Sequence, residues 1–222
     1  MPGAVLARGM LAQQVGDGDA VQELVQIIAQ LGPQMMRQAG VALLAIAGPL
    51  LMLNGCGTTF PRRNPTGEIF PTVQGETLKK EAVRLPGDFA GKPVLLLVGY
   101  EQNTQFDLDR WLLGLTQAKL DVTVREVPTI PGLLPGLFAG AIDSGMRSGI
   151  PDEDWGTVIT VYRDAGKIAE FTGNEGGLPG RVLLLDGDGR VAFFHDEGYS
   201  VGALLNLQQA LERVTNQPHG PQ

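Results

Sequence analysis

The stretch that decides the fold is Pro86-Gly87-Asp88-Phe89-Ala90-Gly91-Lys92-Pro93-Val94-Leu95-Leu96-Leu97-Val98-Gly99-Tyr100. Its first half is rich in turn-forming residues, and its second half is a continuous apolar run of strand-forming residues. A strand that is apolar without alternation belongs in the middle of a sheet that other elements cover on both faces. The sequence therefore predicts an α/β fold built around residues 94–100.

A helix is predicted directly after this strand, over residues 105–119. Four apolar side chains recur there at i, i+3, i+4 and i+7 and so share one helical face: Leu108, Trp111, Leu112 and Leu115. Thr104 stands three residues before Asp107, which is the spacing of a capping box. We expect the helix to begin after Thr104 and to pack on the central strand.

The remaining patterns alternate between strands and helices as far as the carboxyl terminus. The predicted elements are a strand at 122–127, a helical stripe at Leu134, Leu137, Phe138 and Ala141, an acidic loop at 152–154, a strand at 157–162, a hairpin of 181–185 with 190–194, and a helix capped by Ser200. This order predicts a mixed sheet between helices.

Together these patterns resemble the thioredoxin-like fold of redoxins and peroxiredoxins, from residue 68 to about residue 214. The resemblance rests on the entry to the central strand, the helix after it, and the segment from Pro179 into the hairpin. It implies a proline, commonly cis, that faces the active-site loop. Pro179 is the nearest match, although Gly180 and Arg181 separate it from the apolar run.

The sequence departs from that family where its chemistry is done. The family's nucleophilic cysteine lies between the central strand and the next helix, but residues 100–107 contain no cysteine. The chain has a single cysteine, Cys56, so a disulfide within one chain cannot form. We expect neither thiol oxidoreductase nor thiol peroxidase activity.

Cys56 ends a stretch that resembles a bacterial lipoprotein signal peptide. Arg37 precedes the apolar run of residues 41–53, and Leu53-Asn54-Gly55-Cys56 matches the lipobox. The resemblance implies cleavage between Gly55 and Cys56 and a lipid anchor on Cys56. Two alternatives remain open, a permanent membrane-spanning helix and a buried core helix, although Gly48 and Pro49 interrupt the run.

This interpretation divides the chain into four parts. Residues 1–55 are an upstream extension and signal peptide with a start at Met35 or Met36, and residues 56–67 are a flexible tether in which Arg62 and Arg63 are solvated or rest against phosphate head groups. Residues 68–214 are the thioredoxin-like domain, and residues 215–222 are a disordered tail. We expect a cell-envelope protein facing the periplasm or the cell exterior.

A second, narrower resemblance concerns function. Residues 68–78, with 182–186 and 189–191, are similar to mitochondrial ATP synthase assembly factors of the redoxin clan, which also lack the catalytic pair. This resemblance implies a role as an assembly chaperone for a membrane complex.

Charge and composition exclude several other classes. The net charge of −7 argues against nucleic-acid binding. His195 lies beside Asp196 and Glu197, but no second histidine or cysteine completes a metal site, and Asp186-Gly187-Asp188 fits a hairpin turn better than a calcium loop. We therefore expect no metal and no cofactor.

The sequence favours a lipid-anchored, non-redox module that binds an envelope protein or a small ligand. Its candidate surface is Tyr100, Glu101, Gln102, Asn103, Thr104, Phe106, Leu178 and Pro179. Loops at the carboxyl ends of parallel strands are where such sheets usually bind ligands. The alternative is an envelope enzyme that uses Glu101 or His195 as a general base. A strongly shifted carboxyl pKa in a closed pocket would favour that enzyme, and an open groove would favour binding.

Overall fold

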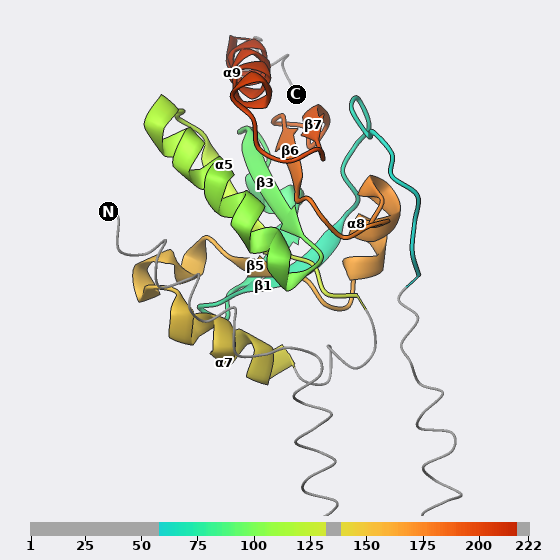
Figure 1. Cartoon of the computed structure of the whole chain (residues 1–222), viewed down its shortest axis with the longest axis vertical. Helices are drawn as coiled ribbons and strands as arrows, with labels where there is room; N and C mark the ends of the chain where they lie inside the picture. Colours follow the sequence, from blue (N-terminus) through green and yellow to red (C-terminus); the bar gives the residue numbers. More distant parts are fainter. Residues whose placement is uncertain (1–57, 132–138, 217–222) are drawn as a thin grey trace, which may run out of the picture.

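The structure is a computed structural model that describes residues 58–131 and 139–216 (Figure 1). The predicted signal peptide, Gly55 and Cys56, most of the helical stripe at 134–141 and residues 217–222 of the predicted tail lie outside these residues. The tail was predicted to start at residue 215, but Thr215 and Asn216 belong to the last helix. Within the described ranges, no helix is both long enough and apolar enough to cross a membrane.

The main sheet has four strands in the order β4-β3-β6-β7. The central strand β3 (Val94–Gly99) is parallel to β4 (Thr123–Pro128) and antiparallel to β6 (Arg181–Leu185). Strand β7 (Val191–His195) pairs with β6 as an antiparallel hairpin. The predicted strand at 94–100, its neighbour and the hairpin are therefore confirmed, and this strand order is that of the thioredoxin-like fold.

A smaller sheet extends this arrangement in the order β2-β1-β5. It contains β1 (Val73–Thr77), β2 (Ala82–Leu85) and β5 (Ile159–Thr160). Single parallel bridges beside β5 join the two sheets by linking Glu126 to Val158 and Thr129 to Val161. The sequence analysis missed β1 and β2 because polar residues and Gly75 interrupt their short apolar patterns, and it made β5 too long.

The helices mostly follow the predicted pattern. Their bounds are η1 (Gly87–Phe89), η2 (Gln102–Thr104), α5 (Gln105–Ala118), α7 (Ala139–Gly149), η3 (Asp152–Gly156), α8 (Ala165–Thr172) and α9 (Val201–Asn216). The predicted acidic loop at 152–154 was wrong, because these residues start η3. Helix α8 was missed, although Ala165, Ile168 and Ala169 recur at helical spacing, because two of these three residues are small.

Strand β3 is buried on both faces, as its apolar run predicts. Val94, Leu96 and Val98 belong to a core that also contains residues of β1, β2 and α8. Leu95 and Leu97 belong to a second core under α5 and α9. The sheet therefore lies between these helical layers (Figure 1). Full burial of each such side chain contributes roughly 1.5–3 kcal/mol.

The start of α5 differs from the prediction. Thr104 makes no side-chain cap for α5, and its hydroxyl instead forms a capping box with Glu101 at the start of η2. Asp107 is thereby free of the capping role that its spacing predicted. The start of α9 agrees with the prediction, because Ser200 Oγ accepts a hydrogen bond of 3.0 Å from the Ala203 N–H.

Residues 58–64, which we call the strap, are held against the domain and are not the flexible tether that the sequence predicted. The Asn174 side chain accepts a hydrogen bond of 2.7 Å from the Phe60 N–H, and the Phe60 carbonyl accepts the N–H groups of Asn174 and Glu175. Arg62 and Arg63 form ion pairs with Asp196 and Glu68. The content of proline, glycine and threonine in residues 56–67 suggested a linker, but Asn174 and Asp196, far away in the sequence, hold the strap in place.

Candidate functional site

Four segments meet at the carboxyl end of β3, and we call this region the site edge. Strands β3 and β7 run in the same direction and β6 runs against them. The residues that follow β3 and β7 therefore lie beside the loop that precedes β6, residues 173–180. The strap crosses the same edge through its hydrogen bonds to Asn174 and Leu178.

The structure brings together the two halves of the candidate surface. Gly177 lies so close to Glu101 that an added Cβ would overlap its carboxylate. Gly180 packs equally closely on Leu108, where an added Cβ would lie 2.5 Å from Cδ2. Between these contacts, the Leu178–Pro179 peptide bond is cis. Leu178 and Pro179 therefore adjoin the loop at 100–106, although more than 70 residues separate them in sequence.

Only part of this surface is open to a partner. Phe106 is 53% exposed and Leu178 is 41% exposed, so both apolar side chains are accessible to a partner. Glu101, Gln102 and Asn103 are also exposed, and Pro179 is partly exposed. Thr104 is buried at 1% exposure and Tyr100 is largely enclosed, so these two residues support the surface from beneath.

Arg181 organises the loop at 173–180, and the sequence analysis did not identify it. Its side chain is fully buried and donates hydrogen bonds to the carbonyls of Gly173, Pro179 and Glu175. Its guanidinium carbon lies 5.6 Å from the centre of the Tyr100 ring, within cation–π range. Burial lowers the pKa of Arg181. Arg181 is the first residue of the otherwise apolar strand β6, and this position is the sequence signal that could have indicated its role.

Tyr100 completes this buried cluster. Its hydroxyl lies 2.6 Å from Thr172 Oγ1, and Thr172 Oγ1 can also donate to the Ile168 carbonyl. Burial raises the pKa of Tyr100 to about 12, while the hydrogen bond to Thr172 and the charge of Arg181 oppose this rise. Tyr100 therefore stays protonated at neutral pH.

We expect alkaline pH to destabilise the protein partly through Tyr100. Its pKa rises on folding from 10.0 to about 12, so its stabilising contribution is present below pH 10 and is lost as pH rises to 12. The loss should be on the order of 2 to 3 kcal/mol. Urea denaturation across this range checks it. Tyr100→Phe should show a smaller alkaline loss. Burial also raises the pKa of Tyr162, which is present in both proteins. The contribution of Tyr100 is therefore the difference between the alkaline stability losses of the wild type and Tyr100→Phe. Equal losses would contradict the prediction.

Asp107 joins three elements at the site edge. Its carboxylate accepts a hydrogen bond of 3.2 Å from the Gly180 N–H and another of 2.8 Å from the Tyr199 N–H. It therefore ties the first turn of α5 to the loop before β6 and to the start of α9. The carboxylate of nearby Asp109 instead accepts a hydrogen bond of 2.8 Å from the Gln105 amide, one turn earlier in the same helix.

The two residues considered as general bases have structural contacts. His195 Nε2 lies 2.7 Å from the Gly198 carbonyl, to which it donates, and the imidazole ring stacks on Phe193. The Glu101 carboxylate accepts a hydrogen bond from the Thr104 N–H in the capping box. His195 lines a surface groove that Glu101 does not line. The structure thus does not assemble these two residues into one site.

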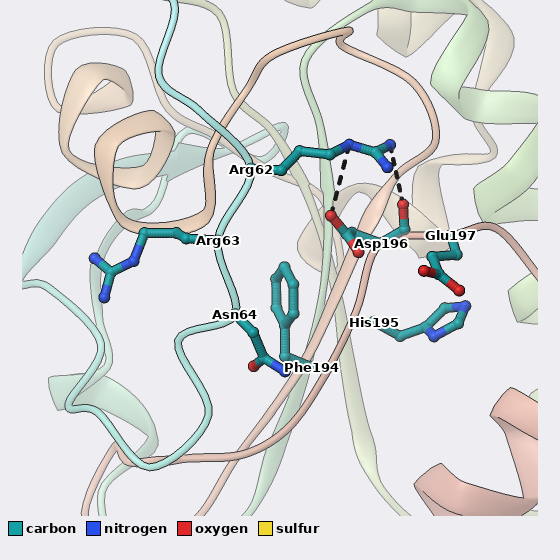
Figure 2. A pocket seen from close by; sticks show the side chains of 7 residues that line it. All are labelled: Arg62, Arg63, Asn64, Phe194, His195, Asp196 and Glu197. Atoms are coloured by element: carbon teal, nitrogen blue, oxygen red, sulfur yellow. Dashed lines mark hydrogen bonds and ion pairs between the residues drawn. The ribbon is translucent and has the colours of Figure 1, made fainter.

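That groove lies between the strap and the end of β7 (Figure 2). It has a volume of about 460 Å³ and is lined by Arg62, Arg63, Asn64, Phe194, His195, Asp196 and Glu197. Figure 2 shows Arg62 reaching Asp196, with Nε 3.7 Å from the carboxylate and Nη2 donating to the backbone carbonyl at 3.2 Å. Across the described residues, no group of three histidine, cysteine or acidic side chains is placed to hold a metal ion.

No family model matches the chain, and no curated protein matches it. Solved structures do match. The exposed lipoprotein thioredoxin Etrx1 of Streptococcus pneumoniae is 17% identical, with a TM-score of 0.43, and covers 63% of this chain and 98% of its own. A SCO1/SenC family lipoprotein of Bacillus anthracis is 13% identical, with a TM-score of 0.47 and coverage of 70% and 100%.

Thiol peroxidase from Chromobacterium violaceum is also 13% identical, with a TM-score of 0.47 and coverage of 70% and 91%. At these identities and TM-scores, the likenesses decide nothing about activity or location. The fold class rests on the strand order and the helical layers. The chain therefore carries a mixed α/β domain of the thioredoxin-like fold class, with no cysteine in residues 100–107 after the central strand.

Proposed function

We propose that the chain is a lipid-anchored, non-redox thioredoxin-like module of the bacterial cell envelope, which binds a protein through its site edge as an assembly factor does. In this proposal residues 1–55 are removed, Cys56 carries the lipid, and residues 68–214 form the binding domain. The anchor would hold the domain on the periplasmic or outer side of its membrane.

One observation carries the binding role. Where a thioredoxin-like enzyme keeps its nucleophile, this chain exposes amide side chains next to Phe106 and Leu178. Exposed apolar side chains flanked by polar ones are typical of protein interfaces. The exposed residues are supported from beneath by the buried cluster of Tyr100 and Arg181, so the surface is preformed. A small ligand would instead need a cleft or cavity that buries most of its surface.

A photo-crosslinker at position 106 tests the binding role. We expect benzoylphenylalanine in place of Phe106 to capture a discrete envelope protein in intact host cells. The matched control is the same substitution at Ile69, which is 50% exposed and forms a β-bridge with Arg190 beside the β6–β7 turn, at the opposite end of the sheet from the site edge. Equal capture at both positions, or none at either, would contradict a specific interface. Insulin reduction by the wild-type protein would contradict the non-redox role.

Mass spectrometry of the protein purified from host membranes tests the anchor. We expect a mature chain that begins at an acylated Cys56, because the lipobox places the cleavage directly before this residue. The Cys56→Ala variant should lose both the lipid and the cleavage. An unmodified wild-type chain that retains residues 1–55 would overturn the anchored role and restore a free thiol at position 56.

A further inference from the structure

The strap is held at the site edge almost as far back as Cys56. The Thr58 carbonyl accepts a hydrogen bond of 3.3 Å from Asn174 Nδ2. Two residues later, the Phe60 carbonyl accepts hydrogen bonds from the N–H groups of Asn174 and Glu175, and the Phe60 N–H donates to the Asn174 side chain. This pattern ties residues 58–60 to the loop that contains Leu178 and Pro179.

Arg62 holds the next part of the strap. Its Nη2 donates to the Leu178 carbonyl at 3.0 Å and to the Asp196 carbonyl at 3.2 Å, and its Nε lies 3.7 Å from the Asp196 carboxylate. Gly173 packs directly under Pro61 and Arg62, where an added Cβ would lie 2.6 Å from the Arg62 Cα. The backbone of Gly173 has a φ of +72°, so a side chain would be strained there as well. The strap and this loop therefore fit one another closely.

This docking shortens the connection between Cys56 and the domain. Two residues span at most about 7 Å, so the Cα of Cys56 must lie within that distance of the Cα of Thr58. A lipid on Cys56 would enter the bilayer close to this point. The domain could not then move far from the membrane at its site edge.

Without the docked strap, the domain would be held at the opposite end of its sheet. The next backbone contacts along the chain are those of Gly67 and Glu68 with Val191, and of Phe70 with Gly189. Gly189 belongs to the turn of the β6–β7 hairpin, far from the end of β7 at His195. The eleven residues from Cys56 to Gly67 could extend to about 40 Å.

We propose that the docked strap fixes the orientation of the domain, so that the site edge faces the lipid surface and the β6–β7 turn points away from it. This inference rests on the proposed lipidation of Cys56. Phe106 and Leu178 then lie on the membrane-facing side, and a partner bound there must itself reach the membrane surface. The strap acts as a short rigid link and not as a tether.

Fluorescence quenching by the lipid surface tests this orientation. The lipidated full chain would carry one new cysteine, through either Asn103→Cys at the site edge or Asp188→Cys in the exposed turn, because the lipid blocks the Cys56 thiol. Each protein is labelled with the same fluorophore and reconstituted in phosphatidylethanolamine and phosphatidylglycerol vesicles with spin-labelled head groups. We expect severalfold stronger quenching at position 103 than at position 188.

Release of the strap should abolish this difference. Arg62→Ala combined with Asn174→Ala removes the side-chain contacts that join the strap to the loop at 173–180 and to Asp196, and quenching at position 188 should then equal or exceed that at position 103. Arg213→Ala, which removes an exposed arginine of α9, is the control and should preserve the difference. Circular dichroism checks that each variant folds. If the double variant fails to fold, the comparison of quenching at positions 103 and 188 in the chain with the intact strap still tests the orientation.

The two proposals fail in different ways. Equal quenching at both positions in a chain that mass spectrometry shows to be lipidated would overturn the fixed orientation and leave the anchored binding role intact. A chain without lipid would overturn the anchored role itself.

Discussion

Replacing Arg181 with methionine should lower the free energy of unfolding by about 3 to 5 kcal/mol. The guanidinium is fully buried and donates hydrogen bonds to the carbonyls of Gly173, Glu175 and Pro179. Methionine has a similar length but donates no hydrogen bonds, so the Glu175 and Pro179 carbonyls lose the arginine donor and the Gly173 carbonyl keeps only the Thr172 hydroxyl. Each buried carbonyl left unsatisfied costs about 1 to 3 kcal/mol, which outweighs the relief from no longer burying a charge.

Urea denaturation in detergent micelles, followed by tryptophan fluorescence, measures this change. Arg181→Lys should fall between the wild type and methionine, because an ammonium keeps the charge but cannot match the planar fork of the guanidinium. The control is Arg110→Met, since Arg110 is exposed on α5. The prediction is wrong if Arg181→Met is no less stable than this control.

Replacing Asp107 with alanine should cost about 2 to 4 kcal/mol, because it removes two hydrogen bonds to a carboxylate at once. The two oxygens serve different partners, with Oδ2 accepting from the Gly180 N–H and Oδ1 from the Tyr199 N–H. Asp107→Asn keeps one acceptor oxygen and should therefore recover about half of the loss. The same denaturation measurement checks both variants.

Asp109→Ala is the matched control for Asp107. It removes the same residue type from the same helix turn, but its carboxylate is engaged by Gln105 four residues earlier, so it should cost under about 1 kcal/mol. If the two alanine variants lost equal stability, Asp107 would contribute only through the helix dipole. Loss of photo-crosslinking at position 106 in Asp107→Ala would further indicate that Asp107 positions the site edge.

The central strand could be predicted because the residue types at consecutive positions indicate its environment. The run from Val94 to Val98 is apolar at every position, and such a strand is stable only when other elements cover both of its faces. The hairpin turn was equally local, since the Asp186 side chain accepts the N–H groups of Asp188 and Arg190 within the turn itself. Helix α9 likewise begins directly after Ser200, whose side chain caps it.

The errors occurred where partners lie far away in the chain. Thr104 and Asp107 have the spacing of a capping box, but the Asp107 carboxylate instead accepts hydrogen bonds from the N–H groups of Gly180 and Tyr199. The strap looked like a linker because its composition is that of a linker. Asn174 and Asp196, more than 110 residues further on, hold it in place.

The sequence by itself determined the α/β class, the central strand and the lack of a thiol in residues 100–107, since these depend on residue type and on spacing over a few positions. Tertiary structure alone decided that Arg181 supports the loop of Leu178 and Pro179, that Thr104 and Tyr100 lie beneath the surface, and that the strap is docked. The physical reason is that hydrogen bonds to buried backbone groups depend on which distant segments meet. A pattern of side chains along the chain does not specify those partners.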